Sequence, residues 1–408
     1  MSTASRAVPR ARARSSTAMI PARSAARARR SMRASSSSSS SSSASTSAAS
    51  SKTEVVVDNA LREDARYAWR GHAVHYERAG DIDAAKHVVF LHGFGVGTFH
   101  YRAQLEELSR GGACVWALDL CGQGDSWPPE GDDGEASLRE LHAQGFQYSA
   151  DTWRDQVEHF LREIVGRPSY VAGNSLGGYL ATYVSATAPS LVRGLILMNA
   201  TPFWGFVQNN ENSLGYRLAP WKGNLPVPKW VSTPFEAYWN SFRSTENVRG
   251  LLGLVYASKA RIDDDLVQRI IAPTNNPNAL SAFCSVVWSP KSKMPFDDML
   301  AALAANDDIP IALVYGKEDP WVVPLWGQRF KRAVPRADYY EISPGGHCPA
   351  HECPAQTNSI IHLWTTYCDG GRIGPPPSGS ADGLGKLIPG KPRNVFEKID
   401  AYRASMTS

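Results

Sequence analysis

The chain has 408 residues, of which 43% are hydrophobic, and a net charge of +4, which allows one large core or a core with an insertion. Six scattered cysteines are too few for a disulfide framework in a chain of this length, so a small disulfide-stabilised domain is excluded and a reducing compartment is expected. No run of eighteen or more apolar residues is present, and we expect no transmembrane segment.

The first 53 residues differ from the rest in composition. They contain nine arginines and Lys52, no acidic residue, and an unbroken serine run from Ser35 to Ser43. An Arg-rich, Ser-rich and acid-poor segment is typical of a transit peptide, and we expect residues 1–53 to be a disordered plastid transit peptide. A generic basic tail is the alternative. Because this segment contributes +10, residues 54–408 carry −6, and no nucleic-acid partner is expected.

Short apolar runs bounded by turn residues predict strands, and three- and four-residue spacing of apolar side chains predicts helices. The expected strands, in chain order, are 54–57, 67–78, 87–91, 113–118, 169–172, 191–198, 310–315 and 337–342. Helices are expected near 101–109, 151–164 and 178–184, and residues 128–149 are interpreted as an acidic surface insertion. This alternation predicts a largely parallel sheet with helices on both faces.

Ser175 lies between two glycines, in the sequence Gly-Asn-Ser-Leu-Gly, after one expected strand and before an expected helix. This is the G-x-S-x-G nucleophile elbow, in which a sharp strand-to-helix turn exposes the serine hydroxyl. Two backbone N–H groups are the candidate donors for an oxyanion that forms during attack on a carbonyl. One belongs to Leu176, at the start of the helix, and the other to Phe94, in the loop after the third expected strand.

The candidate acid and base follow the serine in the order that this arrangement requires. Asp319 follows the strand expected at 310–315, and His347 lies in a turn-rich loop after the last expected strand. The histidine would accept the serine proton, and the aspartate would orient the imidazole. Glu318 is an adjacent alternative acid. Asp119 and Asp125 precede the serine and are assigned a structural role.

The run from His347 to Cys353 contains four nitrogen or sulfur donors within seven residues, which raises the question of a metal site. A zinc site of the usual kind needs a second pair of ligands at a longer separation, and none is apparent. Using His347 as a ligand would also remove the base. We therefore expect no metal and no cofactor.

Residues 201–306 break the alternation of strands and helices and are unusually rich in aromatic residues. We expect a helical lid whose rings form an apolar pocket roof, although many of these rings could simply form the core of the lid. Phe203 and Trp204, together with Trp321 after the acid, are the candidate substrate contacts. The substrate should be large and hydrophobic. Residues 369–408 are rich in glycine and proline and are expected to form a flexible tail.

Together these elements predict an α/β-hydrolase fold, with a mostly parallel eight-stranded sheet built from residues 54–200 and 307–368. Several sequence blocks over residues 60–368 resemble the pheophytinase family of plastid hydrolases from plants and algae. They are Gly93 to Gly97, Trp153 to Gln156, Gly173 to Tyr179, Asn199 to Phe206, Tyr315 to Val322 and Tyr340 to Pro349. The Asn-Ala-Thr-Pro-Phe-Trp-Gly-Phe block and the Pro-Trp pair after the acid are the more specific motifs.

The resemblance implies hydrolysis of the phytyl ester of pheophytin, a hydrophobic pigment ester, to pheophorbide and phytol. It implies a triad of Ser175, Asp319 and His347 and a chloroplast location, in the stroma or at the thylakoid surface. The sequence leaves open whether the protein associates peripherally with thylakoids. A chlorophyll dephytylase, another plastid carboxylesterase or lipase, and a non-catalytic ligand-binding protein of the same fold remain alternatives. Epoxide hydrolases and dehalogenases of this fold are disfavoured, because they have an aspartate where Ser175 stands. The sequence does not indicate an oligomeric state.

Overall fold

The computed structural model describes residues 62–202 and 218–372. The expected transit peptide, the expected strand at 54–57, Phe203, Trp204 and residues 373–408 of the expected tail lie outside the described residues. Eight strands form one sheet in the order β1-β2-β4-β3-β5-β6-β7-β8. Their bounds are β1 Arg62–Trp69, β2 His72–Ala79, β3 His87–Leu91, β4 Cys114–Leu118, β5 Ser169–Asn174, β6 Val192–Met198, β7 Ile311–Gly316 and β8 Asp338–Ile342.

The sheet is parallel from β4 to β8, and β1 and β2 join it antiparallel at one edge. Successive residues of the central strands pack on opposite faces, as a pleated strand requires. In β3, for example, Val89 and Leu91 belong to one hydrophobic cluster, and Val88 and Phe90 belong to the other. The mostly parallel eight-stranded sheet predicted from the sequence is therefore confirmed.

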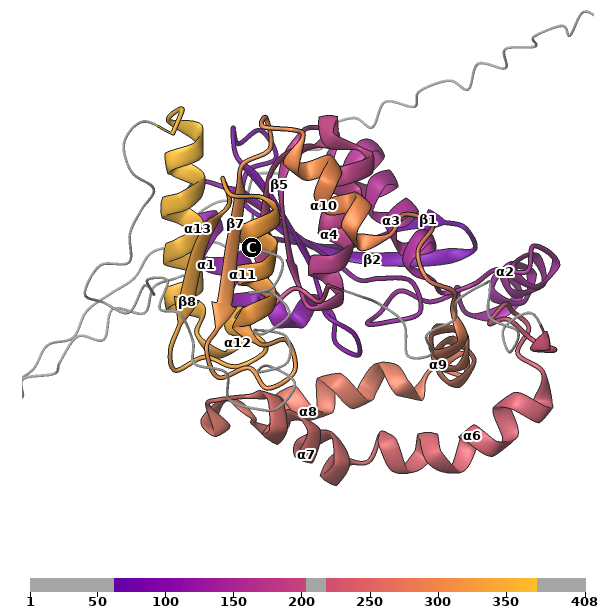
Figure 1. Ribbon diagram of the computed structural model, residues 1–408. Helices are drawn as coiled ribbons and strands as arrows, with labels where there is room; N and C mark the ends of the chain where they lie inside the picture. The colour runs from indigo at the N-terminus through magenta and orange to yellow at the C-terminus, as the bar shows by residue number, and fades with distance from the viewer. Residues whose placement is uncertain (1–61, 203–217, 373–408) are drawn as a thin grey trace, which may run out of the picture. The chain divides into compact units, whose positions relative to one another are not determined.

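Helices cover both faces of this sheet (Figure 1). One face packs against α1 (Arg102–Arg110) and α13 (Pro354–Asp369), which contribute Leu105 and Trp364. The other face packs against the helices α3 (Ala150–His159), α4 (Leu176–Thr187), α10 (Phe296–Ala304) and α11 (Pro324–Ala333). No helix of the described ranges is long and apolar enough to cross a membrane.

Two expectations from the sequence were wrong in detail. The single strand expected at 67–78 is interrupted by a tight turn at Arg70 and Gly71, both at positive φ, so β1 and β2 form a hairpin. Residues 128–149, interpreted as a surface insertion, contain the helix α2 (Gly131–Ala143). Its Leu141 is almost completely buried in the main core, whereas a surface insertion would leave this side chain exposed.

The segment between β6 and β7 is helical in its described part. It contains α6 (Lys229–Phe242), α7 (Thr245–Val255), α8 (Asp264–Ile271) and α9 (Ala279–Trp288), followed by α10. Rings from α6 and α9 form an aromatic cluster in which Trp239 and Phe283 have centroids 5.0 Å apart. The last helix, α10, packs on the core helix α4 instead, where Phe296 stacks on Tyr179. We call residues 218–289 the insertion.

A buried histidine in the hairpin predicts loss of stability in mild acid. His72 donates to the Arg70 carbonyl and bonds the Tyr148 hydroxyl, and burial lowers the pKa of His72 to about 4. In the unfolded chain the histidine has a pKa near 6.5, so between pH 6.5 and pH 4 the unfolded state binds a proton that the folded state does not bind. The free energy of unfolding therefore falls as the pH drops from 6.5 towards 4. The free energy of unfolding measured with urea should be about 2 kcal/mol lower at pH 5 than at pH 7 because of His72 alone. The variant His72→Gln should lack that part of the pH dependence.

Candidate active site

Ser175 occupies a strained turn between β5 and α4. Its backbone has φ 53° and ψ −116°, a left-handed conformation that is rare for serine and typical of residues under functional constraint. The flanking glycines are sterically required. A Cβ at Gly173 would lie 2.2 Å from the Gly177 carbonyl oxygen, and a Cβ at Gly177 would lie 2.0 Å from the Leu91 carbonyl oxygen. The geometry is that of the nucleophile elbow expected from the sequence.

Asp319 and His347 are hydrogen-bonded to each other, with 2.7 Å between Asp319 Oδ2 and His347 Nδ1. The same Oδ2 accepts from Asn199 Nδ2 at 2.7 Å. Oδ1 accepts from the backbone N–H groups of Trp321, at 2.8 Å, and Val322, at 3.1 Å. Four hydrogen-bond donors therefore surround this buried carboxylate and fix its orientation, and a carboxylate that only accepts places the imidazole proton on Nδ1. The lone pair on Nε2 is thereby left to act as a base.

The loop that carries His347 is fixed to the serine turn and to the loop of the acid. Asn174, the residue before Ser175, donates from Nδ2 to the His347 carbonyl at 2.8 Å and to the Met198 carbonyl at 2.9 Å. The Glu318 carboxylate accepts from the Ser343 hydroxyl and the Gly345 N–H, each at 2.8 Å. Glu318 therefore braces the histidine loop, whereas its neighbour Asp319 contacts the imidazole.

The loop after β3 passes next to Ser175. A Cβ at Gly93 would lie 3.4 Å from the Ser175 Cβ. His92 Nδ1 donates to the Gly93 carbonyl at 2.6 Å, while His92 Nε2 accepts from the Leu120 N–H at 3.0 Å, and complete burial lowers the pKa of His92. Because the carbonyl and N–H of one trans peptide point in opposite directions, this bond also orients the Phe94 N–H.

An apolar pocket extends from this loop to the insertion. Phe94 and Gly95 line it on one side, together with residues 122–124 and Trp127. From the insertion it is lined by Trp239, Phe242, Arg243, Val248, Ile270, Pro273, Thr274, Ala279, Phe283 and Val286. Trp321, one of the predicted substrate contacts, is 55% exposed and lies edge-on to the His347 ring at 5.6 Å. The pocket therefore lies where it could accommodate a hydrophobic substituent of an ester bound near Ser175.

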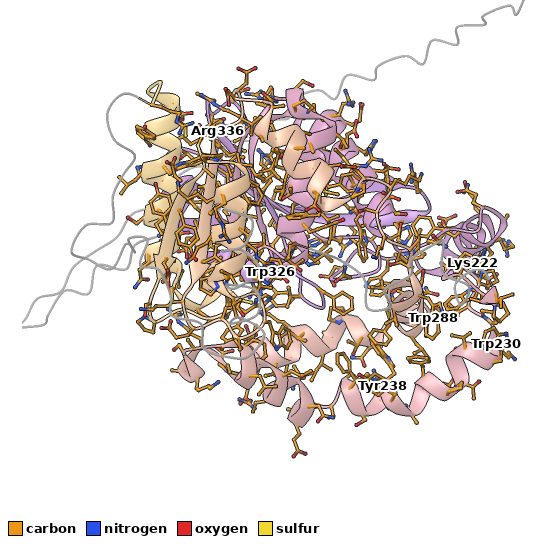
Figure 2. All side chains as sticks on the ribbon, viewed as in Figure 1. Lys222, Trp230, Tyr238, Trp288, Trp326 and Arg336 are labelled. Atoms are coloured by element: carbon orange, nitrogen blue, oxygen red, sulfur yellow. The ribbon has the colours of Figure 1, made fainter. Side chains whose placement is uncertain are left out.

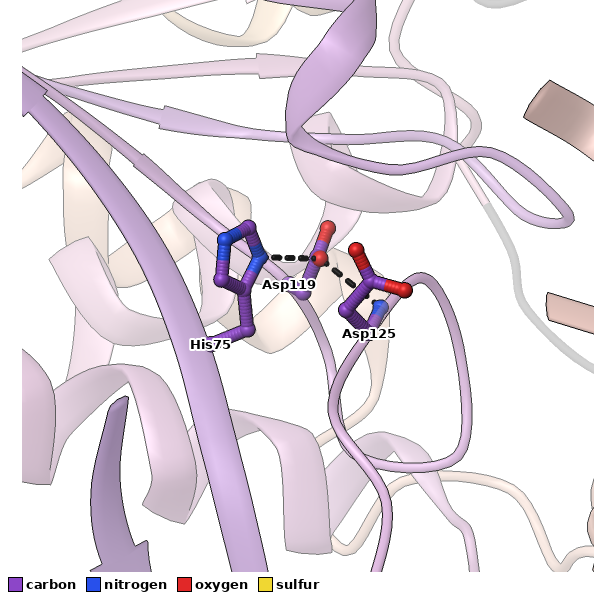
Figure 3. A group of neighbouring side chains, drawn as sticks. All are labelled: His75, Asp119 and Asp125. Atoms are coloured by element: carbon purple, nitrogen blue, oxygen red, sulfur yellow. Dashed lines mark hydrogen bonds and ion pairs between the residues drawn. The ribbon is translucent and has the colours of Figure 1, made fainter. Parts of the chain in front are cut away.

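A second histidine–aspartate group, His75, Asp119 and Asp125, is the one set within the described ranges whose spacing would suit a metal ion (Figure 3). The Asp119 carboxylate already accepts three hydrogen bonds. They come from the Thr98 N–H at 2.7 Å, from His75 Nδ1 at 2.7 Å and from the Asp125 N–H at 2.9 Å. Asp119 thus connects β2 to the short helix Thr98–Tyr101 and to the loop that contains Asp125, which agrees with the structural role expected for it.

Glu352 is a residue of the site region that the sequence did not single out. Its buried carboxylate accepts from the N–H groups of Ala257 at 2.7 Å and Ser258 at 3.3 Å in the insertion, and from the Cys348 N–H at 3.1 Å. Cys348 follows His347, whose own N–H donates to the Val255 carbonyl at 2.9 Å. Burial raises the pKa of Glu352, and the backbone N–H groups oppose this rise. Glu352 therefore joins the insertion to the histidine loop.

We expect Glu352→Gln to lower kcat by about tenfold to a hundredfold, the equivalent of one or two hydrogen bonds to a charged group. Both Glu352 oxygens accept N–H donors, so the amide nitrogen of glutamine must face one of them. The pH dependence of kcat should shift as well, because the imidazole would be held less firmly. Unchanged kcat and pH profile, in a variant with an unaltered melting temperature, would contradict the positioning role.

A match to the family described as "Alpha/beta hydrolase family" covers residues 88–360. The chain belongs to the α/β-hydrolase family. It is similar to "Pheophytinase, chloroplastic" of Arabidopsis thaliana, with 42% identity over 317 residues that cover 73% of this chain and 65% of the Arabidopsis protein. The chain therefore spans about two thirds of that relative's length.

Two further comparisons concern more distant proteins. A "(Lyso)-N-acylphosphatidylethanolamine lipase" of Homo sapiens is 28% identical over 299 residues, covering 67% of this chain and 77% of the human protein. The crystal structure of a haloalkane dehalogenase DbeA-M1 loop variant from Bradyrhizobium elkanii covers 77% of this chain and 100% of its own, with a TM-score of 0.56 and 18% identity. The second likeness supports the fold alone.

Proposed function

We propose that this chain is a serine carboxylic-ester hydrolase that cleaves the phytyl ester of pheophytin, with Ser175, His347 and Asp319 as its triad. The observation that carries the proposal is the Asp319–His347 hydrogen bond of 2.7 Å, held beside the strained Ser175 turn by Asn174. The substrate follows from the 42% identity to the Arabidopsis protein named for pheophytin, and the apolar pocket at Phe94 suits a long isoprenoid chain.

In the proposed reaction, His347 Nε2 takes the Ser175 Oγ proton while Oγ forms a bond to the ester carbonyl carbon. The N–H groups of Phe94 and Leu176 donate to the oxyanion. The bond to the phytyl oxygen then breaks, and His347 returns the proton to the departing phytol. Water attacks the acyl-enzyme with His347 again as base, the bond to Ser175 Oγ breaks as His347 returns a proton to Oγ, and pheophorbide leaves as a carboxylic acid.

The test is a parallel assay of the purified protein with pheophytin, chlorophyll and a simple chromogenic ester. We expect phytol release chiefly from pheophytin. Preferential release from the magnesium-containing pigment would reject this choice in favour of a chlorophyll dephytylase. Hydrolysis of the chromogenic ester alone would indicate another carboxylesterase, and no hydrolysis of any substrate would favour a non-catalytic binding protein.

We also propose that the protein acts in the chloroplast, with residues 1–53 as its transit peptide and residues 201–306 as a lid over the site. The support is the composition of that segment and the chloroplastic relative. Import of the full chain into isolated plastids, followed by sequencing of the new N-terminus, tests this. A product that keeps its N-terminal 53 residues, or a failure of import, would reject the transit peptide.

Peripheral thylakoid association forms part of the same proposal. Four large apolar side chains of the insertion are exposed, namely Leu218 at 72%, Trp230 at 59%, Tyr238 at 54% and Leu254 at 64%, and the two on α6 are labelled in Figure 2. Exposed tryptophan and tyrosine suit a membrane interface. We expect Trp230→Glu to lower co-sedimentation with neutral phosphatidylcholine vesicles severalfold, with chromogenic-ester activity retained. Equal sedimentation of both proteins would contradict the association.

A further inference from the structure

A second cavity lies between the insertion and the core, apart from the apolar pocket. Its volume is about 170 Å³, room for several waters at about 30 Å³ each. On the core side it is lined by the short helix Thr98–Tyr101, by the start of α1 and by the segment after the histidine loop. On the insertion side it is lined by residues between 261 and 269. Unlike the first pocket, its lining is rich in charged and polar side chains.

Three guanidinium groups line this cavity, and their charges are incompletely matched. Arg269 Nε donates to Asp265 Oδ2 at 2.7 Å, whereas Arg102 is 3.9 Å from the same carboxylate, beyond hydrogen-bonding distance. Arg102 Nε is buried with no hydrogen-bond partner among the described residues. No carboxylate of the described ranges lies within ion-pair distance of the Arg261 guanidinium. Asp265 is therefore paired with Arg269 and lies near Arg102, whereas no ion pair within the described ranges involves Arg261.

The other acidic group that lines the cavity, Asp263, keeps its charge but is hydrogen-bonded to the backbone. Asp263 caps the N-terminus of α8, where its Oδ1 accepts from the Leu266 N–H at 2.8 Å. Burial, and then the like charge of Arg269, lower the pKa of Arg102, while the carboxylates of Glu77 and Asp265 oppose this change. Two guanidinium groups that repel each other across a cavity are stabilised when an anion enters between them.

A buried histidine adds an unused polar group. His100 lines the cavity, is 5% exposed and stacks on His351 with ring centroids 4.9 Å apart. Its Nε2 is buried and has no hydrogen-bond partner in the part of the chain that the structure describes. A buried polar atom without a partner is costly, and such atoms often mark the place of an ion or a ligand.

We propose that this cavity binds a phosphate group, held by Arg102 and Arg269 with Arg261 at its edge. A tetrahedral oxyanion offers several oxygens to guanidinium groups that approach from two sides, whereas a carboxylate would satisfy one bidentate arginine. The two sources of such a group are free phosphate compounds and the headgroup of an anionic lipid. The site is separate from Ser175, and the proposal is independent of the reaction proposed above.

Occupation of the site would connect two parts of the fold. Arg102 belongs to α1 of the core, and Arg269 belongs to α8 of the insertion. The cavity is also lined by Ala350 and His351, which follow His347 in the chain. A bound phosphate group therefore fixes the insertion against the core next to the histidine loop, and it adds to the tie that Glu352 already makes there.

The experiment measures thermal unfolding of the full chain with inorganic phosphate, against chloride at equal ionic strength. At phosphate concentrations tenfold above its Kd, the melting temperature should rise by about 2 to 4 °C. Arg102→Gln and Arg269→Gln should lose this rise, and Arg102→Lys should keep part of it. Arg249→Gln is the matched control, because Arg249 lies on α7 and bonds the Ile262 carbonyl without lining the cavity.

A second arm distinguishes the source by co-sedimentation with phosphatidylglycerol vesicles. If a lipid headgroup is the ligand, sedimentation should fall severalfold in Arg102→Gln but not in Arg249→Gln. If free phosphate is the ligand, only the thermal shift should depend on Arg102. An equal response of all variants in both arms, or an equal shift with chloride, overturns the site. Should Arg102→Gln fail to fold, the exposed Arg261→Gln provides the same comparison.

Discussion

Replacing Ser175 with alanine should abolish hydrolysis of pheophytin and of a chromogenic ester, lowering kcat by an order of about 10⁶. The hydroxyl is the group that the proposed mechanism makes covalent with the acyl group, and no other side chain can take over that bond. Alanine fits the turn as serine does, because φ 53° is set by the flanking glycines and by the β5–α4 connection. The melting temperature should therefore hardly change, and pigment binding should persist.

Ser185→Ala is the control for this experiment. Ser185 is a buried serine on α4, the helix that follows Ser175, and its hydroxyl donates to the Ala181 carbonyl at 2.7 Å. It makes no contact with the site, so its removal should leave kcat within about twofold of the parent. Comparable activity in Ser175→Ala and Ser185→Ala would show that the nucleophile had been misassigned.

The sequence predicted those parts of the molecule that depend on local patterns. Buried runs such as 87–91 mark strands by composition alone, and the glycines around Ser175 reflect clashes within a few residues of the turn. The order of serine, acid and histidine pointed to His347 and to the loop of Glu318 and Asp319, and in the structure Asp319 is the one hydrogen-bonded to His347. The hydrogen bond between the Ser175 hydroxyl and His347 Nε2 stays a prediction, and so do the donor roles of the Phe94 and Leu176 N–H groups.

The supporting residues could not be found in this way, because their roles arise from contacts between distant segments. Asn199 binds Asp319 across 120 positions, and Glu352 binds the insertion across 95. Asn199 does carry a local sequence signal, since it is a short polar residue directly after an expected strand, and asparagine tolerates positive φ. In the structure its φ is indeed positive, at 39°. Glu352 carries none, as an acidic residue within a run of cysteine and histidine looks like an ordinary surface residue.

Replacing Asp319 with asparagine should lower kcat by about 10⁴-fold while the fold is kept. Asp319 Oδ1 accepts two backbone N–H groups, so the oxygen of the asparagine amide must take that place. The amide nitrogen then faces His347 Nδ1, which must accept a hydrogen bond, and the imidazole proton moves to Nε2. An imidazole protonated at Nε2 cannot take the proton of Ser175. The amide nitrogen would also meet Asn199 Nδ2, which now donates to Oδ2.

Glu318→Gln separates this electronic effect from a general loosening of the loop. Glu318 is the neighbouring carboxylate, and it binds Ser343 and Gly345 without touching the imidazole. Because Asn174 and Glu352 still hold the histidine loop, kcat should fall by no more than about tenfold. Steady-state kinetics with a chromogenic ester would measure both variants. A larger loss in Glu318→Gln than in Asp319→Asn would transfer the role of the acid to Glu318, since only the residue that sets the imidazole tautomer can have the larger effect.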